Sequence, residues 1–260
     1  MSTVLAASLI LFASGAAAVL LALLSDRFVP LSLRRDLGRY GGMVSVIALG
    51  LFTLTVATVV TFAWLDLAAG QRSSSREATA LTEVYWYAHS VGGKEGLELQ
   101  VLLRDYTTQV INAEWPFMAS SGELTDRGWN LADRIRLDLE KIEPKPDGPT
   151  VRYSAALQSV SDLFIGRRER EALVDSRAPA LLWVAVVLSA LVVVLLPVVR
   201  GNPRPATRAV LAFVAAASVA FVIFLLYQLN GPFSGAIKVD PTAFRWAAQG
   251  YDDIDAQWKP

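Results

Sequence analysis

Four long uncharged stretches constrain this chain more than any other feature of its sequence. Residues 4–24, 43–64, 180–199 and 209–229 contain no Asp, Glu, Lys or Arg. Helices rise about 1.5 Å per residue, so stretches of this length reach roughly 30 Å, the thickness of the hydrocarbon core of a bilayer. A chain of 260 residues cannot bury four such helices in a soluble core. We therefore predict an all-α integral membrane protein with four transmembrane helices.

The order of these stretches divides the chain into two hairpins around a polar region. We expect a first transmembrane hairpin at 1–64, a central helical module at 65–179, a second transmembrane hairpin at 180–229 and a C-terminal tail at 230–260. The central region carries 14 basic and 18 acidic side chains, which is the composition of a soluble helical module. The first apolar stretch is longer than that of a signal peptide and lacks a basic start, so we expect it to remain in the protein.

The composition excludes several functional classes. The 24 basic and 24 acidic residues balance, and no dense Lys/Arg run offers a surface for nucleic acid. Without cysteine and with one histidine, the chain has no disulfide, thiolate metal site or paired-imidazole site. No G-x-S-x-G, P-loop or H-E-x-x-H motif is present, so we predict no enzyme, no cofactor and no metal site. The uncharged stretches disfavour a proton-coupled transporter but allow a passive channel.

Apolar residues at three- and four-residue spacing predict helices in the central region. We place these helices at 77–88, 94–113, 126–142 and 151–176. The first is expected to continue the second uncharged stretch out of the membrane. Glu114-Trp115-Pro116 is interpreted as the stop of the second helix, because a residue before proline disfavours helical backbone. The proline-rich run 143–149 is interpreted as a loop that ends the third.

Three threonines in the second uncharged stretch lie roughly on one helix face. Thr55, Thr58 and Thr61 are three residues apart. In a pore, this face would line a polar path. Alternatively, each hydroxyl bonds to its own helix backbone and the residues pack at helix contacts. Small residues at four-residue spacing near Ala18 and Ala216 predict close helix packing in the first and fourth stretches.

A basic cluster precedes the third uncharged stretch. Its members are Arg167, Arg168 and Arg170. They are candidates for contacts with anionic lipid head groups or for concentrating anions at a pore entrance. Alternatively, the cluster is a solvated helix face with local ion pairs to Glu169 and Glu171.

Several short motifs in this chain resemble those of one known family. Glu77 opens the helix after the second stretch, Tyr106 is followed by Glu114-Trp115-Pro116, and Pro232-Phe233-Ser234-Gly235 follows the fourth stretch. These motifs and the order of two stretches, helical module and two stretches resemble the bestrophin-like family of bacterial four-span membrane proteins. The motif set is Glu77, Tyr106, Glu114, Trp115, Pro116, Pro232, Phe233, Ser234 and Gly235.

The resemblance implies an oligomeric anion channel. Bestrophins are pentamers whose pore is lined by the second span and narrows at bulky apolar residues one helical turn apart. The nearest match to this constriction is Phe52, Val56 and Val60. Together with the three threonines, the pore-lining candidates are Phe52, Thr55, Val56, Thr58, Val60 and Thr61. The calcium-binding acidic cluster of bestrophins has no counterpart that we can place. The expected partners are the lipid bilayer and further copies of the chain. The alternative function is a non-conducting membrane-anchored scaffold or stress-response module that binds a partner through the central region.

Charge does not decide the orientation. The two short loops contain seven arginines, and eight basic residues lie near the span ends on the other side of the membrane. The positive-inside rule is therefore undecided, although the density of charge in the short loops weakly favours a central module outside the cell. The resemblance implies the opposite: a multi-pass protein of the bacterial plasma membrane, with the central module and both termini in the cytoplasm. We adopt that orientation as the prediction.

Overall fold

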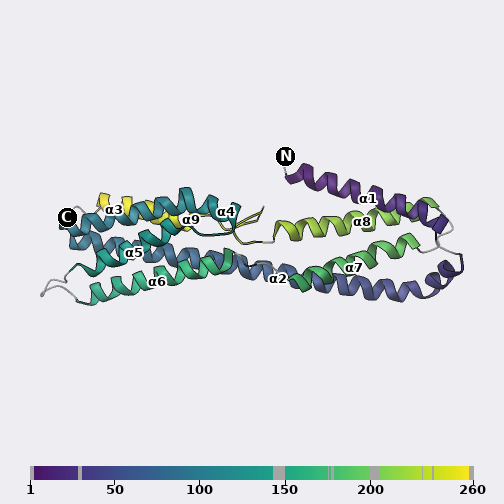
Figure 1. The fold of residues 1–260 in the computed structure, drawn as a ribbon, viewed down its shortest axis with the longest axis horizontal. Coiled ribbons are helices and arrows are strands. Elements are labelled where there is room, and N and C mark those ends of the chain that lie inside the picture. Colours follow the sequence, from purple (N-terminus) through teal and green to yellow (C-terminus); the bar gives the residue numbers. More distant parts are fainter. Residues whose placement is uncertain are drawn as a thin grey trace. The chain divides into compact units, whose positions relative to one another are not determined.

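A computed structural model describes residues 3–28, 31–142, 150–174, 176, 179–199, 205–229, 231–235 and 237–257. All regular secondary structure within these residues is helical, which confirms the predicted all-α class (Figure 1). The predicted proline-rich loop at 143–149 lies outside the described residues. The chain forms two compact units, which we call unit 1 (Met1–Trp64 and Arg177–Asn230) and unit 2 (Leu65–Ser176 and Gly231–Pro260). The expected C-terminal tail thus belongs to unit 2.

Unit 1 contains the apolar helices. They are α1 (Thr3–Phe28), the first part of α2 (Leu31–Val91), α7 (Ala180–Val199) and α8 (Pro205–Gln228). In Figure 1, α1 lies along α8. Ala18 and Ala22 of α1 form one buried cluster with Ala212 and Ala216 of α8. The predicted close packing is confirmed here, because small side chains let the two backbones approach.

Two helical segments within the described residues are long and apolar enough to cross a membrane. They are Gly42–Val91 and Ala206–Gln228. The segments Ser8–Leu24 and Ala180–Leu195 are apolar but shorter. Length and composition therefore support two of the four predicted spans, and the other two stay predictions.

Unit 2 is a bundle of amphipathic helices. Its elements are the second part of α2, α3 (Gly93–Gln109), the π-helix η1 (Val110–Glu114), α4 (Trp115–Ser121), α5 (Asp126–Glu140), α6 (Thr150–Val174) and α9 (Thr242–Gln257). Leu81, Leu103, Ile135 and Phe244 lie at the centre of its apolar core. The reversal between α2 and α3 uses Gly92 and Gly93, both at φ 64°, a conformation that glycine adopts without steric cost.

The predicted helix stop at Glu114-Trp115-Pro116 is wrong. The helical path continues from α3 through η1 into α4. Pro116 lies in the first turn of α4, directly after the π-helical turn of η1, so the helical path accommodates the proline at this junction. The path ends at Ser121, where Gly122 adopts φ 73° and its N–H donates to the Met118 carbonyl at 3.1 Å.

Candidate functional site

Unit 2 contains charged side chains without any solvent exposure. Glu77, Glu114, Arg167 and Arg170 are each 0% exposed, and so is Tyr106. We call these five residues the buried charge cluster. They come from α2, η1, α6 and α3, so the cluster connects most helices of the unit. Isolated charges in such an interior would be very unfavourable, and the two carboxylates therefore balance the two guanidinium groups.

The two arginines hold the two carboxylates in paired geometry. Arg170 donates from Nε to Glu77 Oε2 at 3.0 Å and from Nη2 to Glu77 Oε1 at 2.9 Å. Arg167 donates from Nη1 and Nη2 to the two Glu114 oxygens at 2.9 and 2.7 Å. Arg170 Nη1 also lies 2.8 Å from Glu114 Oε1 and joins the two pairs. Bidentate arginine–carboxylate pairs of this kind fix the orientation of the two groups as well as their distance.

Neutral groups complete the cluster. The Tyr106 hydroxyl donates to Glu77 and accepts from Arg167 Nη1 at 3.0 Å. The Thr125 hydroxyl, at the N-cap of α5, donates to Glu114 at 3.1 Å. Aromatic rings cover the guanidinium faces, with Arg167 4.8 Å from the Trp129 centroid. Arg170 lies over the rings of Trp115 and Phe244 at 5.3 and 5.4 Å. These rings supply cation–π attraction where water is absent.

The pairing decides the charge state of the cluster. Burial alone would raise the pKa of Glu114, but Arg170 and Arg167 outweigh it and lower this pKa below its ordinary value. Burial likewise opposes the charged form of Arg170, yet Glu77 and Glu114 raise the pKa of its guanidinium. Burial and the nearby Glu77 raise the pKa of Tyr106 well above its ordinary value, so its hydroxyl stays protonated as a donor.

Glycine provides the space that the cluster occupies. A Cβ at Gly128 would lie 2.2 Å from Glu114 Oε2 and 2.3 Å from Arg167 Nη2. A Cβ at Gly166 would lie 3.0 Å from the Glu77 backbone nitrogen. The five side chains of the cluster have no contact with solvent. The physical effect of the cluster is to fix α2, η1 and α6 against one another. No group of three His, Cys, Asp or Glu in the described part of the chain is placed to hold a metal ion.

The arginine cluster of the sequence is divided by the fold. Arg167 and Arg170 lie inside unit 2, whereas Arg168 between them is exposed. The interpretation of a solvated face therefore holds only for Arg168. Arg167 and Arg170 offer no surface to lipid or to a passing anion, because both side chains are fully buried and their Nη2 atoms donate to Glu114 and Glu77.

The Pro232-Phe233-Ser234-Gly235 motif packs beside the buried charge cluster. The ring of Phe233 meets that of Trp115 edge-on, with centroids 5.6 Å apart. Trp115 Nε1 donates to the Val239 carbonyl at 3.1 Å, and Val239 N–H donates to the Pro232 carbonyl at 2.8 Å. Pro232 and Phe233 are buried, Ser234 is half-buried and Gly235 is exposed at φ 89°. The motif thus closes a loop over the tryptophan that covers Arg170.

The pore candidates on α2 divide between two faces. Phe52 is 7% exposed and packs, with Val56, against α7 and α8 residues such as Val186 and Val219. Val60 is 40% exposed. The hydroxyls of Thr55, Thr58 and Thr61 each donate to the backbone carbonyl four residues earlier in α2. The threonine donors are therefore already used by the helix itself.

A surface network fastens α9 to α2 and α3. Arg104 donates to Asp252 at 2.7 Å and to Asp255 at 2.9 Å, and the Tyr85 hydroxyl donates to Asp255 at 2.8 Å. The rings of Tyr85 and Tyr251 stack with centroids 4.2 Å apart. Burial, followed by the hydrogen bond to Asp255, raises the pKa of Tyr85 to about 12. Asp252 and Asp255 thus act in ion pairs.

Comparison with protein families identifies the relatives of this chain. Residues 12–244 match the Bestrophin-like domain, which covers most of the sequence. The chain belongs to the bestrophin-like family. The resemblance drawn from the motifs is confirmed. A comparison with curated proteins gives no significant match.

Solved structures show a related fold for this bestrophin-like chain. The crystal structure of a membrane protein with a proline-to-alanine substitution has a TM-score of 0.54 at 11% identity, covering 95% of this chain and 99% of that chain. A bacterial bestrophin homologue from Klebsiella pneumoniae with an aspartate-to-alanine substitution has a TM-score of 0.49 at 10% identity, covering 98% and 100%. Only the first of these supports the fold. The family supports a location in the membrane.

The bestrophin-like motif residues meet in one region of unit 2. Glu77, Tyr106 and Glu114 belong to the buried charge cluster, and Trp115 and Phe233 cover it. Sequence reasoning missed the partners, Arg167 and Arg170. A signal was present: both lie at helical spacing from Leu163 and thus on the apolar face of α6. A charge on an apolar face indicates a buried partner rather than solvent.

Proposed function

We propose that this chain is one subunit of an oligomeric anion channel in a bacterial plasma membrane, with a pore lined by the first part of α2. The observation that carries the proposal is the match of residues 12–244 to the Bestrophin-like domain. Bestrophins assemble as pentamers, and we extend that assembly to this chain. The proposal includes four membrane spans, with unit 2 and both termini in the cytoplasm.

The packing of α2 narrows the proposed lining. Phe52 and Val56 contact α7 and α8 of the same chain, so the proposed lining is the face of α2 that carries Thr58 and Thr61. Because the threonine hydroxyls donate to backbone carbonyls, this face presents methyl groups and oxygen lone pairs to the path. Such a lining favours a narrow, weakly hydrated constriction over a strong anion-binding site. We therefore expect weak discrimination among small anions.

Reconstitution of the purified protein in planar bilayers tests the channel. We expect a chloride current from the wild type. The chain has no cysteine, so single cysteines can map the lining. A charged thiol reagent should block current through Thr61→Cys, which is exposed. It should leave current through the matched control Val59→Cys unchanged, because Val59 is 3% exposed and packs within the chain.

The second candidate function is the scaffold, which predicts a different experimental result. An oligomer that never conducts would contradict the channel. The scaffold predicts a protein partner that co-purifies with the full chain and is lost when the surface of unit 2 is altered. Block at Val59→Cys but not at Thr61→Cys would contradict the proposed lining while leaving conduction itself intact.

A further inference from the structure

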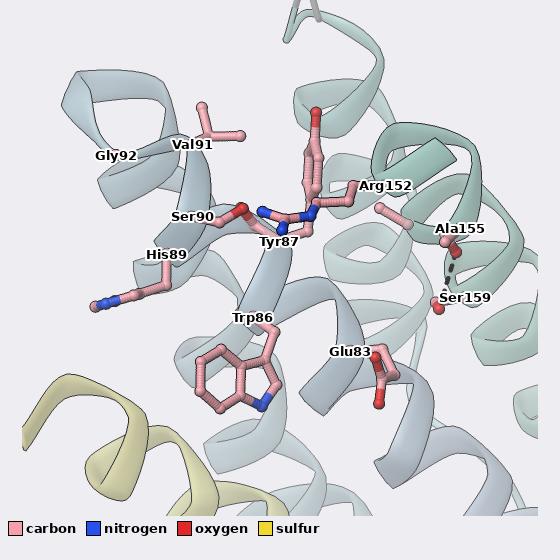
Figure 2. Close-up of a pocket in the computed structure, with 11 residues that line it drawn as sticks. Glu83, Trp86, Tyr87, His89, Ser90, Val91, Gly92, Arg152, Ala155 and Ser159 are labelled. Atoms are coloured by element: carbon pink, nitrogen blue, oxygen red, sulfur yellow. Dashed lines mark hydrogen bonds between the residues drawn. The ribbon is translucent and has the colours of Figure 1, made fainter. Parts of the chain in front are cut away.

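A cavity of about 730 Å³ lies in unit 2 between the last turns of α2 and the first half of α6. It shares no residue with the buried charge cluster. Its walls include Glu83, Trp86 and Ser90 of α2 and Arg152, Ala155 and Ser159 of α6 (Figure 2). The volume is within the usual range for sites that bind small molecules.

The two ends of this cavity carry opposite charges. The helices α2 and α6 run antiparallel, as contacts of Tyr87 with Tyr153 and of Arg76 with Asp162 show. Arg152 therefore lies toward the Ser90 end and Glu83 toward the Ser159 end. Figure 2 shows Arg152 extending from α6 toward α2. Seven residues separate Glu83 from Ser90, which is about 10 Å of helix rise.

Neither charge has a partner among the described residues. Glu83 and Arg152 are both exposed and form no ion pair and no side-chain hydrogen bond within that part of the chain, so a ligand from solvent can reach both. Arg152 also lies in the first turn of α6, which begins at Thr150. A helix N-terminus adds its dipole to the attraction for an anion. The Arg152 end is therefore suited to a phosphate group.

An aromatic surface lies between the two charges. Trp86 is 40% exposed and is three residues after Glu83, so the indole and the carboxylate share one face of α2. An exposed indole is a stacking surface for a nucleobase. A carboxylate only accepts hydrogen bonds, and its two oxygens suit a base edge with two adjacent N–H donors. Guanine has such an edge, whereas adenine presents a single amino group beside an acceptor.

We propose that this cavity binds a guanine nucleotide, with its phosphate at Arg152, its base on Trp86 and its base edge at Glu83. From the Ser90 end of the cavity to the Ser159 end, Arg152 is followed by Trp86 and Glu83, which is the order of phosphate, base and base edge in the ligand. An inorganic anion would contact Arg152 alone, whereas a nucleotide also contacts Trp86 and Glu83. The proposal is independent of conduction.

Equilibrium binding to the purified full chain in detergent tests this site, with GTP, ATP and inorganic phosphate as probes. We expect saturable binding of GTP and weaker binding of ATP. Arg152→Ala should weaken GTP binding at least about tenfold, because it removes a charge-assisted hydrogen bond. Glu83→Ala should abolish the preference for GTP over ATP. The matched control is Arg168→Ala, an exposed arginine of α6 outside the cavity, which should bind GTP like the wild type.

Three outcomes would overturn the proposal. They are the absence of saturable GTP binding, equal binding of inorganic phosphate, and equal effects of Arg152→Ala and Arg168→Ala. Trp86→Ala is a second variant, with circular dichroism as the check that the bundle is folded. If Trp86→Ala changes the mass of the oligomer and the wild type binds no GTP, the cavity is a subunit contact and the proposal fails.

Discussion

Arg167 and Arg168 are neighbours in α6 with opposite environments. The first is fully buried against Glu114 and the ring of Trp129, and the second is exposed. A buried guanidinium has lost its hydration, so its contribution depends entirely on its partners. The same substitution at these two positions should therefore have very different effects.

Arg167→Met is expected to lower the free energy of unfolding by about 3–5 kcal/mol, because the buried Glu114 carboxylate loses its bidentate partner and keeps only the Arg170 guanidinium. Arg168→Met should change it by no more than about 0.5 kcal/mol, as is usual at exposed positions. Chemical unfolding in detergent, followed by circular dichroism, measures both. Similar losses at the two positions would contradict the buried pairing.

Stability should also depend on pH through Glu114. Its pKa in the folded state is lowered from 4.5, so its contribution is fully present above that pH and is lost as pH falls through the lowered value. Glu114→Gln should be less stable than the wild type at pH 7, and the difference should shrink at pH 3. Unfolding curves across this range measure the difference. A difference that does not change with pH would argue against an ionised Glu114.

At the scale of elements, η1 decides where the cluster can form. A π-helical turn accommodates one extra residue in a helical path. It brings Glu114 and Trp115 to the interior, whereas Ala113 stays exposed. An uninterrupted α-helix over the same residues would turn Glu114 away by about 100°.

Two length changes at Ala113 test the role of the π-helical turn. Deleting Ala113 removes the extra residue and leaves Glu114 on the same face, so the free energy of unfolding should change by no more than about 1 kcal/mol. Inserting one alanine after Ala113 rotates Glu114 by about 100° and should cost at least as much as Glu114→Gln. Chemical unfolding followed by circular dichroism measures the free energy of unfolding of both variants. Equal tolerance of both changes would contradict the assigned role.

At the scale of the molecule, the C-terminal segment of the chain forms part of the core of unit 2. Phe244 and Tyr251 of α9 are fully buried there, and α2 contributes to both units. The buried charge cluster holds the unit 2 part of α2 against α6. In the proposed channel, the cluster thus connects the helix that lines the pore to the rest of the subunit.

The orientation of the whole molecule can be measured at Ser121, which is exposed at the end of α4. We expect Ser121→Cys to resist a membrane-impermeant thiol reagent in intact cells and to react after permeabilisation, because unit 2 is proposed to be cytoplasmic. The native chain has no cysteine and serves as the blank. Labelling in intact cells would place unit 2 outside.

Particular residues mark the limit of prediction from sequence. Helices 126–142 and 151–176 were predicted close to α5 and α6, because three- and four-residue spacing is a local signal. Continuation of the helix past Pro116 was not predicted, because the spacing of apolar residues does not indicate the π-helical turn before it. The roles of Arg167 and Arg170 were missed because their partners lie 53 and 93 residues away in the chain.

The sequence alone determined the all-helical class, the apolar stretches and the family, since these depend on composition, periodicity and short motifs. Tertiary structure decided which charges are buried, which face of α2 packs within the chain and where the C-terminal segment belongs. The reason is physical. Local patterns state what each residue prefers, but a buried guanidinium is stable only when a distant carboxylate is brought to within hydrogen-bonding distance.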